Sequence, residues 1–206
     1  MKNYEIFLFR HGITDNNLRG EYTGITDPPL CTSGRQTISD FAQSDFYPNV
    51  GRVYTSPLAR CIETAYLAYP AHGLGHGFHP IENLREYNFG EYEGKTPEQL
   101  SEFPEYSEWL KGGMESRPPG GESHAEFTTR CIKGIEEVFA DMSRSEINKS
   151  AVITHAGVIV TLLSGCGLPK GTPADFVLNP GEGWLIRMST YLWQKGNVFE
   201  IVGKLS

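Results

Sequence analysis

The sequence has little cysteine and no long apolar run. Its four cysteines lie far apart and form no CxxC pair, which excludes a zinc ribbon and a thiol–disulfide redox motif. No apolar stretch approaches the roughly 20 residues of a membrane-spanning helix. The first apolar run, residues 6–9, is followed at once by Arg10 and His11, unlike a secretory leader. Reduced thiols without a leader predict a cytoplasmic protein with no membrane partner.

Positive charge is also scarce. The chain has 18 Lys and Arg against 25 Asp and Glu, a net charge of -7, so most of its surface repels nucleic acid and anionic lipid. Of the 206 residues, 39% are hydrophobic and 12% aromatic, which excludes a disordered or fibrous chain. The length predicts a single domain over residues 1–206 and leaves the oligomeric state open.

Three short apolar segments are typical of buried strands, at residues 4–9, 52–55 and 151–154. After the second strand, Ser56 is a favourable N-cap and Pro57 suits the first helical position, so a helix carrying Arg60 is expected there. After the third strand, residues 158–163 form an apolar helical run. Strands alternating with helices predict a parallel sheet with crossover helices.

Further signals complete the predicted fold. Ser123 and Glu126 have capping-box spacing at the start of a long amphipathic helix, in whose first turn we expect His124 to be exposed. Thr96 and Gln99 indicate a short helix within an insertion at about 92–121, expected over the active site. Residues 184–193 and 198–205 predict a hairpin turned at 195–197. The fold class is therefore α/β, a three-layer α/β/α sandwich with a mostly parallel central sheet and a C-terminal antiparallel hairpin.

Two of the predicted strands end in histidine followed closely by glycine, at 10–12 and 154–157. Open α/β sheets bind ligands at the carboxyl ends of their strands, so His11 and His155 are expected to reach one small ligand there. Arg10 and Arg60 add two guanidinium groups, and the helix after His155 adds free amides. Together these groups suit a tetrahedral phosphate.

At this point the chain resembles the histidine phosphatase superfamily, in its phosphoglycerate-mutase-like branch, and most of all the bacterial broad-specificity and α-ribazole-phosphate phosphatases. The matching blocks are Arg10, His11, Gly12, Thr14 and Asn17; Tyr22, Thr23, Gly24, Thr26, Asp27, Leu30 and Gly34; and residues 56–65, 84–94, 119–123 and 152–157. The departures are Ile13, where Glu is usual, and Val160, where related phosphatases often have Arg.

The resemblance implies a phosphoglycerate-mutase-like fold and a metal-independent phosphomonoesterase that needs no cofactor and acts on a small-molecule phosphate ester. By it, His11 is the nucleophile that forms a phosphohistidine, and Glu86 is the general acid and base. Arg10, Arg60 and His155 hold the phosphoryl oxygens. The expected substrate-binding residues are Asn17, Thr23, Gly24, Tyr87 and Ala156.

Elementary electrostatics adds two expectations. An imidazole attacks only when neutral, and two nearby guanidiniums lower the pKa of His11. The same cations should keep Glu86 ionised in the free protein, so we expect it to take a proton only when a phosphate dianion binds.

Two alternatives to a phosphatase remain. Mutases usually carry Arg directly after the catalytic Glu, where this chain has Tyr87, and the insertion offers only three cations: Lys95, Lys111 and Arg117. Without a second phosphate site, water is favoured as the acceptor of the phosphoryl group. A catalytically inactive module that binds phosphorylated ligands is the other alternative.

The role of one group of aromatic side chains stays open, and one group of histidines is not expected to bind metal. The aromatic residues Tyr87, Phe103, Tyr106 and Trp109 either line the leaving-group side of the pocket or bury the insertion. The histidines His72, His76 and His79 lie in a glycine-rich stretch that cannot hold a regular helical face, so no metal site is expected there.

Overall fold

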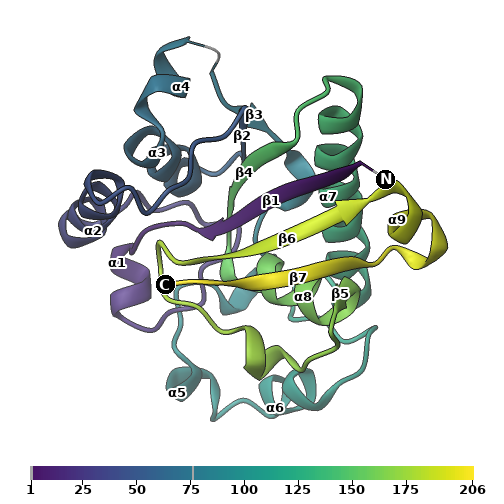
Figure 1. The fold of residues 1–206 in the computed structure, drawn as a ribbon. Coiled ribbons are helices and arrows are strands. Elements are labelled where there is room, and N and C mark those ends of the chain that lie inside the picture. The colour runs from purple at the N-terminus through teal and green to yellow at the C-terminus, as the bar shows by residue number, and fades with distance from the viewer. Residues whose placement is uncertain (1, 76) are drawn as a thin grey trace.

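The computed structural model describes residues 2–75 and 77–206, and within them seven strands form one mixed sheet in the order β3-β2-β4-β1-β6-β7-β5 (Figure 1). The parallel pairs are β3–β2, β2–β4, β4–β1 and β5–β7, whereas β6 is antiparallel to β1 and β7. The strands are β1 (Asn3–Arg10), β2 (Arg52–Thr55), β3 (His79–Pro80), β4 (Lys149–Thr154), β5 (Gly167–Leu168), β6 (Gly183–Ser189) and β7 (Phe199–Leu205). The sheet confirms the predicted fold class.

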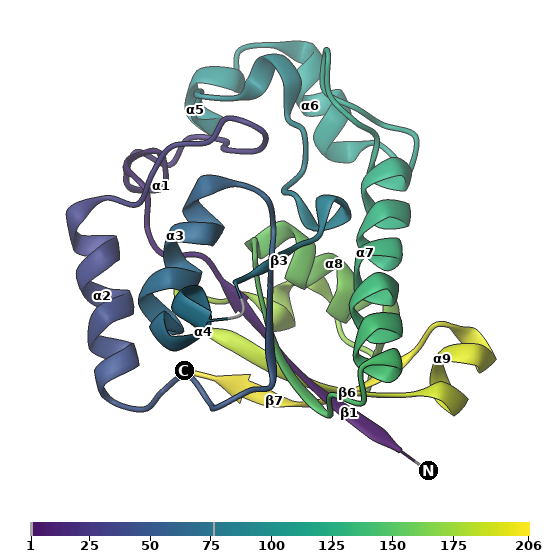
Figure 2. The same cartoon turned by 90° about the horizontal axis from the view of Figure 1, so that it is seen from above.

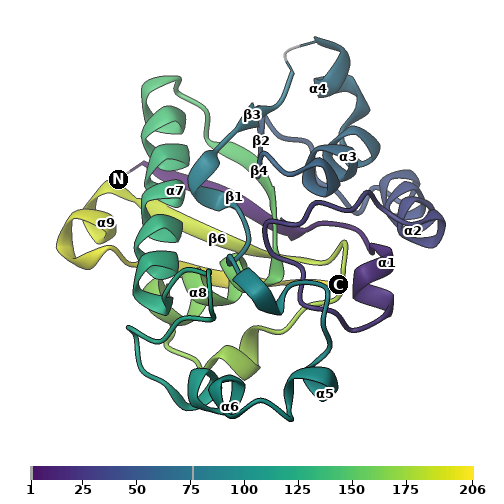
Figure 3. The same cartoon turned by 180° about the vertical axis from the view of Figure 1, so that it is seen from behind.

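Helices cover both faces of the sheet, with α2 to α4 on one side and α7 and α8 on the other (Figure 2). The α-helices are α1 (Asp15–Leu18), α2 (Thr32–Gln43), α3 (Ala59–Ala68), α4 (Pro70–Gly75), α5 (Pro97–Leu100), α6 (Pro104–Lys111), α7 (His124–Arg144), α8 (Ala156–Cys166) and α9 (Thr190–Gly196). Short 3₁₀ turns occupy Glu82–Leu84, Gly90–Tyr92 and Pro173–Phe176. In Figure 3, α5 and α6 lie together at one end of the molecule.

Alternation along β1 explains the three layers. Ile6 and Leu8 belong to the core that includes α7 and α8, whereas Phe7 and Phe9 belong to the core that includes α2 and α3. Because successive side chains of a strand point to opposite faces, a continuously apolar strand needs a helical layer on each side.

The start of α3 differs from the prediction. The helix begins at Ala59 with Leu58 as its N-cap, which supplies no side-chain hydrogen bond, so neither Ser56 nor Pro57 takes the expected position. The Ser56 hydroxyl instead contacts His155 Nε2 at 2.8 Å. A carboxylate from a distant loop replaces it, because Asp27 accepts a hydrogen bond from the Ala59 amide at 2.6 Å.

The C-terminal segment is partly as expected. β6 and β7 pair antiparallel, but β6 ends at Ser189, and residues 190–196 form α9 where strand and turn were predicted. Ser189 caps this helix by accepting from the Leu192 amide at 3.3 Å. Asn197 ends it in the left-handed region at φ 52°. A local capping signal therefore overrides the strand pattern of the tyrosine and tryptophan that follow it.

Both predicted capping boxes form. They start α5 at Thr96 and α7 at Ser123. Across the two described ranges, the structure contains no helix with the length and apolarity needed to cross a bilayer.

The cap of α7 yields a stability prediction. Ser123 Oγ accepts from the Glu126 amide at 3.2 Å, and Glu126 accepts from the Ser123 amide at 2.8 Å. Ser123→Ala should lower the free energy of unfolding by about 1 kcal/mol, because the Glu126 amide at the start of the helix then loses its acceptor. Urea denaturation measures this. Thr129→Ala, at an exposed position of the same helix, is the control and should change the free energy by less than about 0.5 kcal/mol.

Candidate active site

The two histidines lie side by side because β1 and β4 are parallel neighbours. Arg10 pairs with Thr154 in the register, so His11 and His155 leave the sheet at the same edge. Their ring centroids are 5.2 Å apart. His155 is fully buried behind His11, with its Nε2 near both the Ser56 hydroxyl and, at 3.5 Å, the Cys61 sulfur.

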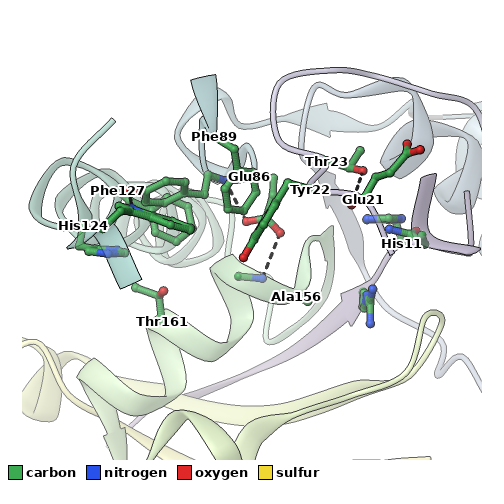
Figure 4. A pocket seen from close by; sticks show the side chains of 15 residues that line it. His11, Glu21, Tyr22, Thr23, Glu86, Phe89, His124, Phe127, Ala156 and Thr161 are labelled. Atoms are coloured by element: carbon green, nitrogen blue, oxygen red, sulfur yellow. Dashed lines mark hydrogen bonds between the residues drawn. The ribbon is translucent and has the colours of Figure 1, made fainter. Parts of the chain in front are cut away.

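A pocket of about 430 Å³ opens at this edge (Figure 4). Of the residues predicted for the site, the ones that line it are Arg10, His11, Asn17, Thr23, Glu86, Tyr87 and Ala156. Arg60, His155 and Gly24 are buried and do not line it. The other lining residues are Glu21, Tyr22, Phe89, Trp109, His124, Phe127, Gly157 and Thr161.

The protonation of His11 follows from its surroundings. Its Nδ1 lies 2.7 Å from the Gly12 carbonyl oxygen, which can only accept, so the proton of the neutral ring sits on Nδ1 and Nε2 keeps its lone pair. Burial, assisted by Arg60 and Arg10, holds the pKa of His11 well below its usual range. His11 is therefore a neutral imidazole, as expected from the arginines, although burial is the larger cause.

Arg60 is fully buried although it is charged. Its Nη2 donates to the Gly24 carbonyl at 2.8 Å and its Nη1 to the Thr26 carbonyl at 2.9 Å, and its nearest carboxylate is Asp27 at 3.4 Å. Within the described residues, the Nε atoms of Arg60 and Arg10 are buried without a hydrogen-bond partner. Unpartnered guanidinium N–H groups beside the histidine pair fit an anionic ligand, because burying them unpaired costs free energy.

Glu86 is anchored by two backbone amides. Its oxygens accept from the Tyr87 amide at 2.9 Å and from the Gly157 amide at 3.0 Å, near the start of α8. A Cβ on Gly157 would lie 2.3 Å from Glu86 Oε1, so only glycine permits this approach.

The pKa of Glu86 has opposing causes. Burial raises the pKa of Glu86 and outweighs the two amides and the arginines, which lower it. The arginines therefore act in the expected direction, but desolvation makes the net shift upward.

An ion pair outside the pocket fixes the loop that carries Glu86. Arg130 on α7 donates to the carbonyls of Asn83 at 3.2 Å, Arg85 at 2.6 Å and Glu86 at 2.8 Å, and it pairs with Glu122. The Glu122 carboxylate also accepts from the Asn88 amide at 2.8 Å. The backbone is thus held on both sides of Glu86.

Aromatic side chains form the wall of the pocket opposite His11. Trp109 lines it, as does Tyr87, whereas Phe103 is half exposed and Tyr106 is buried behind the wall. His124 is partly buried and lies nearly parallel to Trp109, with ring centroids 6.0 Å apart, so the expectation that it is exposed is wrong.

The sequence reasoning did not assign several lining residues to the site. Tyr22 adjoins the predicted Thr23, and Phe89 lies in the block that carries Glu86. Their places in these two motif blocks could have indicated that they line the site. His124 and Phe127 follow a capping box, which explains their helix without indicating the pocket. Of the three histidines of the glycine-rich segment, His76 lies outside the described residues. His72 and His79 do not line this pocket.

Comparisons with known proteins identify the family of the chain. The model of the histidine phosphatase superfamily (branch 1) matches residues 6–194. The adenosylcobalamin/alpha-ribazole phosphatase of Salmonella typhimurium is 26% identical over 161 residues, covering 77% of each chain. A 2,3-bisphosphoglycerate-dependent phosphoglycerate mutase of Arthrobacter is 28% identical and covers 88% of this chain and 92% of its own.

The fold is similar to that of a solved structure. The alpha-ribazole phosphatase from Shigella flexneri superposes with a TM-score of 0.80 at 23% identity, covering 98% of this chain and 96% of its own. The family model's match, residues 6–194, includes the two histidines, the two arginines and Glu86 of the candidate site. The chain belongs to the histidine phosphatase superfamily, branch 1.

Proposed function

We propose that the protein is a phosphomonoesterase that hydrolyses a small phosphate ester through a phosphohistidine on His11, with Glu86 as general acid and base. The observation that carries the proposal is the neutral His11, with its lone pair on Nε2, in one pocket with Arg10 and a buried carboxyl of raised pKa. The lowered pKa of His11 and the raised pKa of Glu86 each lie in the direction that the first chemical step requires.

In the first step, His11 Nε2 forms a bond to phosphorus as the ester P–O bond breaks, and the leaving oxygen takes the proton from Glu86. The Gly12 carbonyl, already bonded to Nδ1, stabilises the positive charge that develops on the ring. Arg10 contacts the phosphoryl group from the pocket lining, whereas Arg60 and His155 are buried outside the lining and act on it from behind the pocket wall. Positioning and charge stabilisation of this kind supply most of the catalysis in phosphoryl transfer.

In the second step, the Glu86 carboxylate takes a proton from water, the water oxygen bonds to phosphorus, and the N–P bond breaks. Neutral His11, protonated Glu86 and inorganic phosphate result, so the cycle closes. Asn17, Thr23, Tyr87 and Ala156 line the rest of the proposed substrate site, and the buried Gly24 supports it by accepting a hydrogen bond from Arg60.

Water is a better acceptor here than a second phosphorylated molecule. Among the lining residues that the structure describes, Arg10 is the one guanidinium and lysine is absent. A mutase must retain its intermediate through a second anion site, and this pocket offers no further fixed cation for it. Phosphoglycerate mutase activity and ligand binding without turnover are the outcomes that would replace the proposal.

The nucleophile is tested by His11→Ala. Phosphate release from p-nitrophenyl phosphate, in the presence of a chelator, should fall by at least about 10³-fold, because the other imidazole of the lining, His124, lies on the aromatic wall opposite His11. Alkaline quenching after incubation with labelled substrate should trap phosphoenzyme in the wild type only. The matched control, His79→Ala, alters a half-buried histidine outside the pocket and should keep full activity. Phosphoenzyme in the alanine variant would contradict the assignment of His11.

The acid is tested by pH. Since the pKa of His11 is lowered, kcat/KM should fall on the acid side only well below pH 6.5, as His11 takes a proton. Since the pKa of Glu86 is raised, its protonated form should persist above pH 4.5, and kcat/KM for an alkyl phosphate should fall as Glu86 then ionises. p-Nitrophenyl phosphate, whose leaving group needs no proton, should lack this second limb. The phosphate itself ionises at a different pH in the two esters, so its pKa is measured for each ester and its effect divided out before the difference is assigned to Glu86.

Glu86→Gln should lower kcat/KM for the alkyl ester by about 10²-fold or more and for p-nitrophenyl phosphate far less. Equal losses with both esters would contradict the role of Glu86 as the acid.

The positioning role of Arg130 gives a third test. Arg130→Met removes the donors that hold three carbonyls, so kcat/KM for an alkyl phosphate should fall about 10-fold or more, with a smaller loss for p-nitrophenyl phosphate. The control is Arg144→Met, in the last turn of the same helix, where the side chain is 76% exposed. An equal loss for both esters would indicate general destabilisation instead.

A further inference from the structure

The pocket has two chemically different halves. The half at the strand ends carries His11, Arg10 and Glu86, which the proposed chemistry uses. The half toward α6 and α7 holds aromatic rings that the phosphoryl chemistry does not use. Figure 4 shows Phe89, His124 and Phe127 on that side, with Tyr22 extending between them and His11.

The aromatic half is a connected wall built from separate segments of the chain. Tyr22 and Phe89 have ring centroids 4.8 Å apart, Tyr87 and Phe127 5.1 Å apart, and Tyr87 and His124 5.4 Å apart. The Tyr22 hydroxyl bonds that of Tyr106 at 2.8 Å, which fixes the ring. Tyr22 and Phe89 are only partly buried, so a ligand in the pocket can contact their rings. Such rings bind flat, apolar groups by stacking and edge contacts.

The cations near this half are engaged elsewhere. Arg19 is held by Glu21, with Nε 2.6 Å from Oε1 and Nη2 2.9 Å from Oε2. Lys95 donates to the Glu91 carbonyl at 2.6 Å, and Arg117 lies 3.4 Å from Glu126. None of these three cations lines the pocket. A carboxylate or second phosphate on the leaving group would therefore lose water without gaining a positive partner.

From these contacts we infer the substrate class: a phosphate monoester whose alcohol carries a flat aromatic ring and no negative charge. The inference rests on the proposed phosphomonoesterase activity. The phosphate occupies the half with His11 and Arg10, while the ring of the alcohol packs between Tyr22, Phe89 and His124. Anionic alcohols are rejected because the aromatic faces carry partial negative charge. Arg130 lies over the Phe127 ring at 4.7 Å, but it pairs with Glu122 and does not line the pocket.

Three esters test the class, all with leaving alcohols of similar acidity: benzyl, 4-carboxybenzyl and ethyl phosphate. The value of kcat/KM should be at least about 10-fold higher for benzyl than for ethyl phosphate, and about 10-fold higher for benzyl than for 4-carboxybenzyl phosphate, each equivalent to about 1.4 kcal/mol. The 4-carboxybenzyl ester adds bulk as well as charge, so anion rejection is separated from size by the Thr161→Arg variant, which supplies a positive partner.

Two variants connect these ratios to the wall. Phe89→Leu keeps the site apolar but removes a ring, and should lower the benzyl-to-ethyl ratio several-fold. Phe103→Leu, which alters a 52% exposed ring outside this pocket, should leave the ratio unchanged. Thr161→Arg places a cation at a partly exposed lining position of α8 and should raise kcat/KM for 4-carboxybenzyl phosphate about 10-fold.

The outcomes distinguish failure of the substrate class from failure of the proposed phosphomonoesterase activity. Turnover with equal kcat/KM for benzyl and ethyl phosphate, or for benzyl and 4-carboxybenzyl phosphate, would overturn the substrate class and leave the phosphomonoesterase standing. No turnover of any of these esters or of p-nitrophenyl phosphate would overturn the proposed function and the substrate class with it.

Discussion

The pairing of β1 with β4 is the constraint on which the rest of the structure depends. Because the two strands are parallel and in register at Arg10 and Thr154, their next residues present two imidazoles to one point at the edge of the sheet. The register is protected by the core. A slip of one residue would turn Ile6 and Leu8 toward the wrong helical layer, so apolar burial on both faces fixes the geometry of the histidine pair.

Burial in the site sets the protonation states as strongly as the charges do. Low polarity disfavours the charged form of every group, so it lowers the pKa of His11 and raises that of Glu86. The neutral base and the protonated acid of the proposed mechanism therefore share one physical origin. The buried Arg60 remains charged, and three acceptors from the 24–27 loop compensate for part of its desolvation.

The sequence predicts the parts of the structure whose signals are local. The apolar runs of β1, β2 and β4, and the capping boxes at Thr96 and Ser123, need only neighbouring residues. The start of α3 could not be predicted in this way, because Ser56 bonds His155 from the next strand of the sheet and Asp27 takes its place as the cap. The aromatic wall could not be predicted for the same reason, since Tyr22, Phe89 and His124 come together only through tertiary packing. The positions of His11 and His155 at strand ends predicted their place in the site. No periodicity in the sequence indicated the aromatic residues on the opposite side of the pocket.

The four cysteines have a consequence for oxidative stress. All are buried and free, and burial raises the pKa of Cys61, the one beside His155. The thiolate is the form that peroxides attack, so a protonated thiol without access to solvent is protected chemically as well as sterically. The proposed imidazole chemistry uses no thiol, so with Cys61 in this state it would continue in conditions that inactivate enzymes with a cysteine nucleophile.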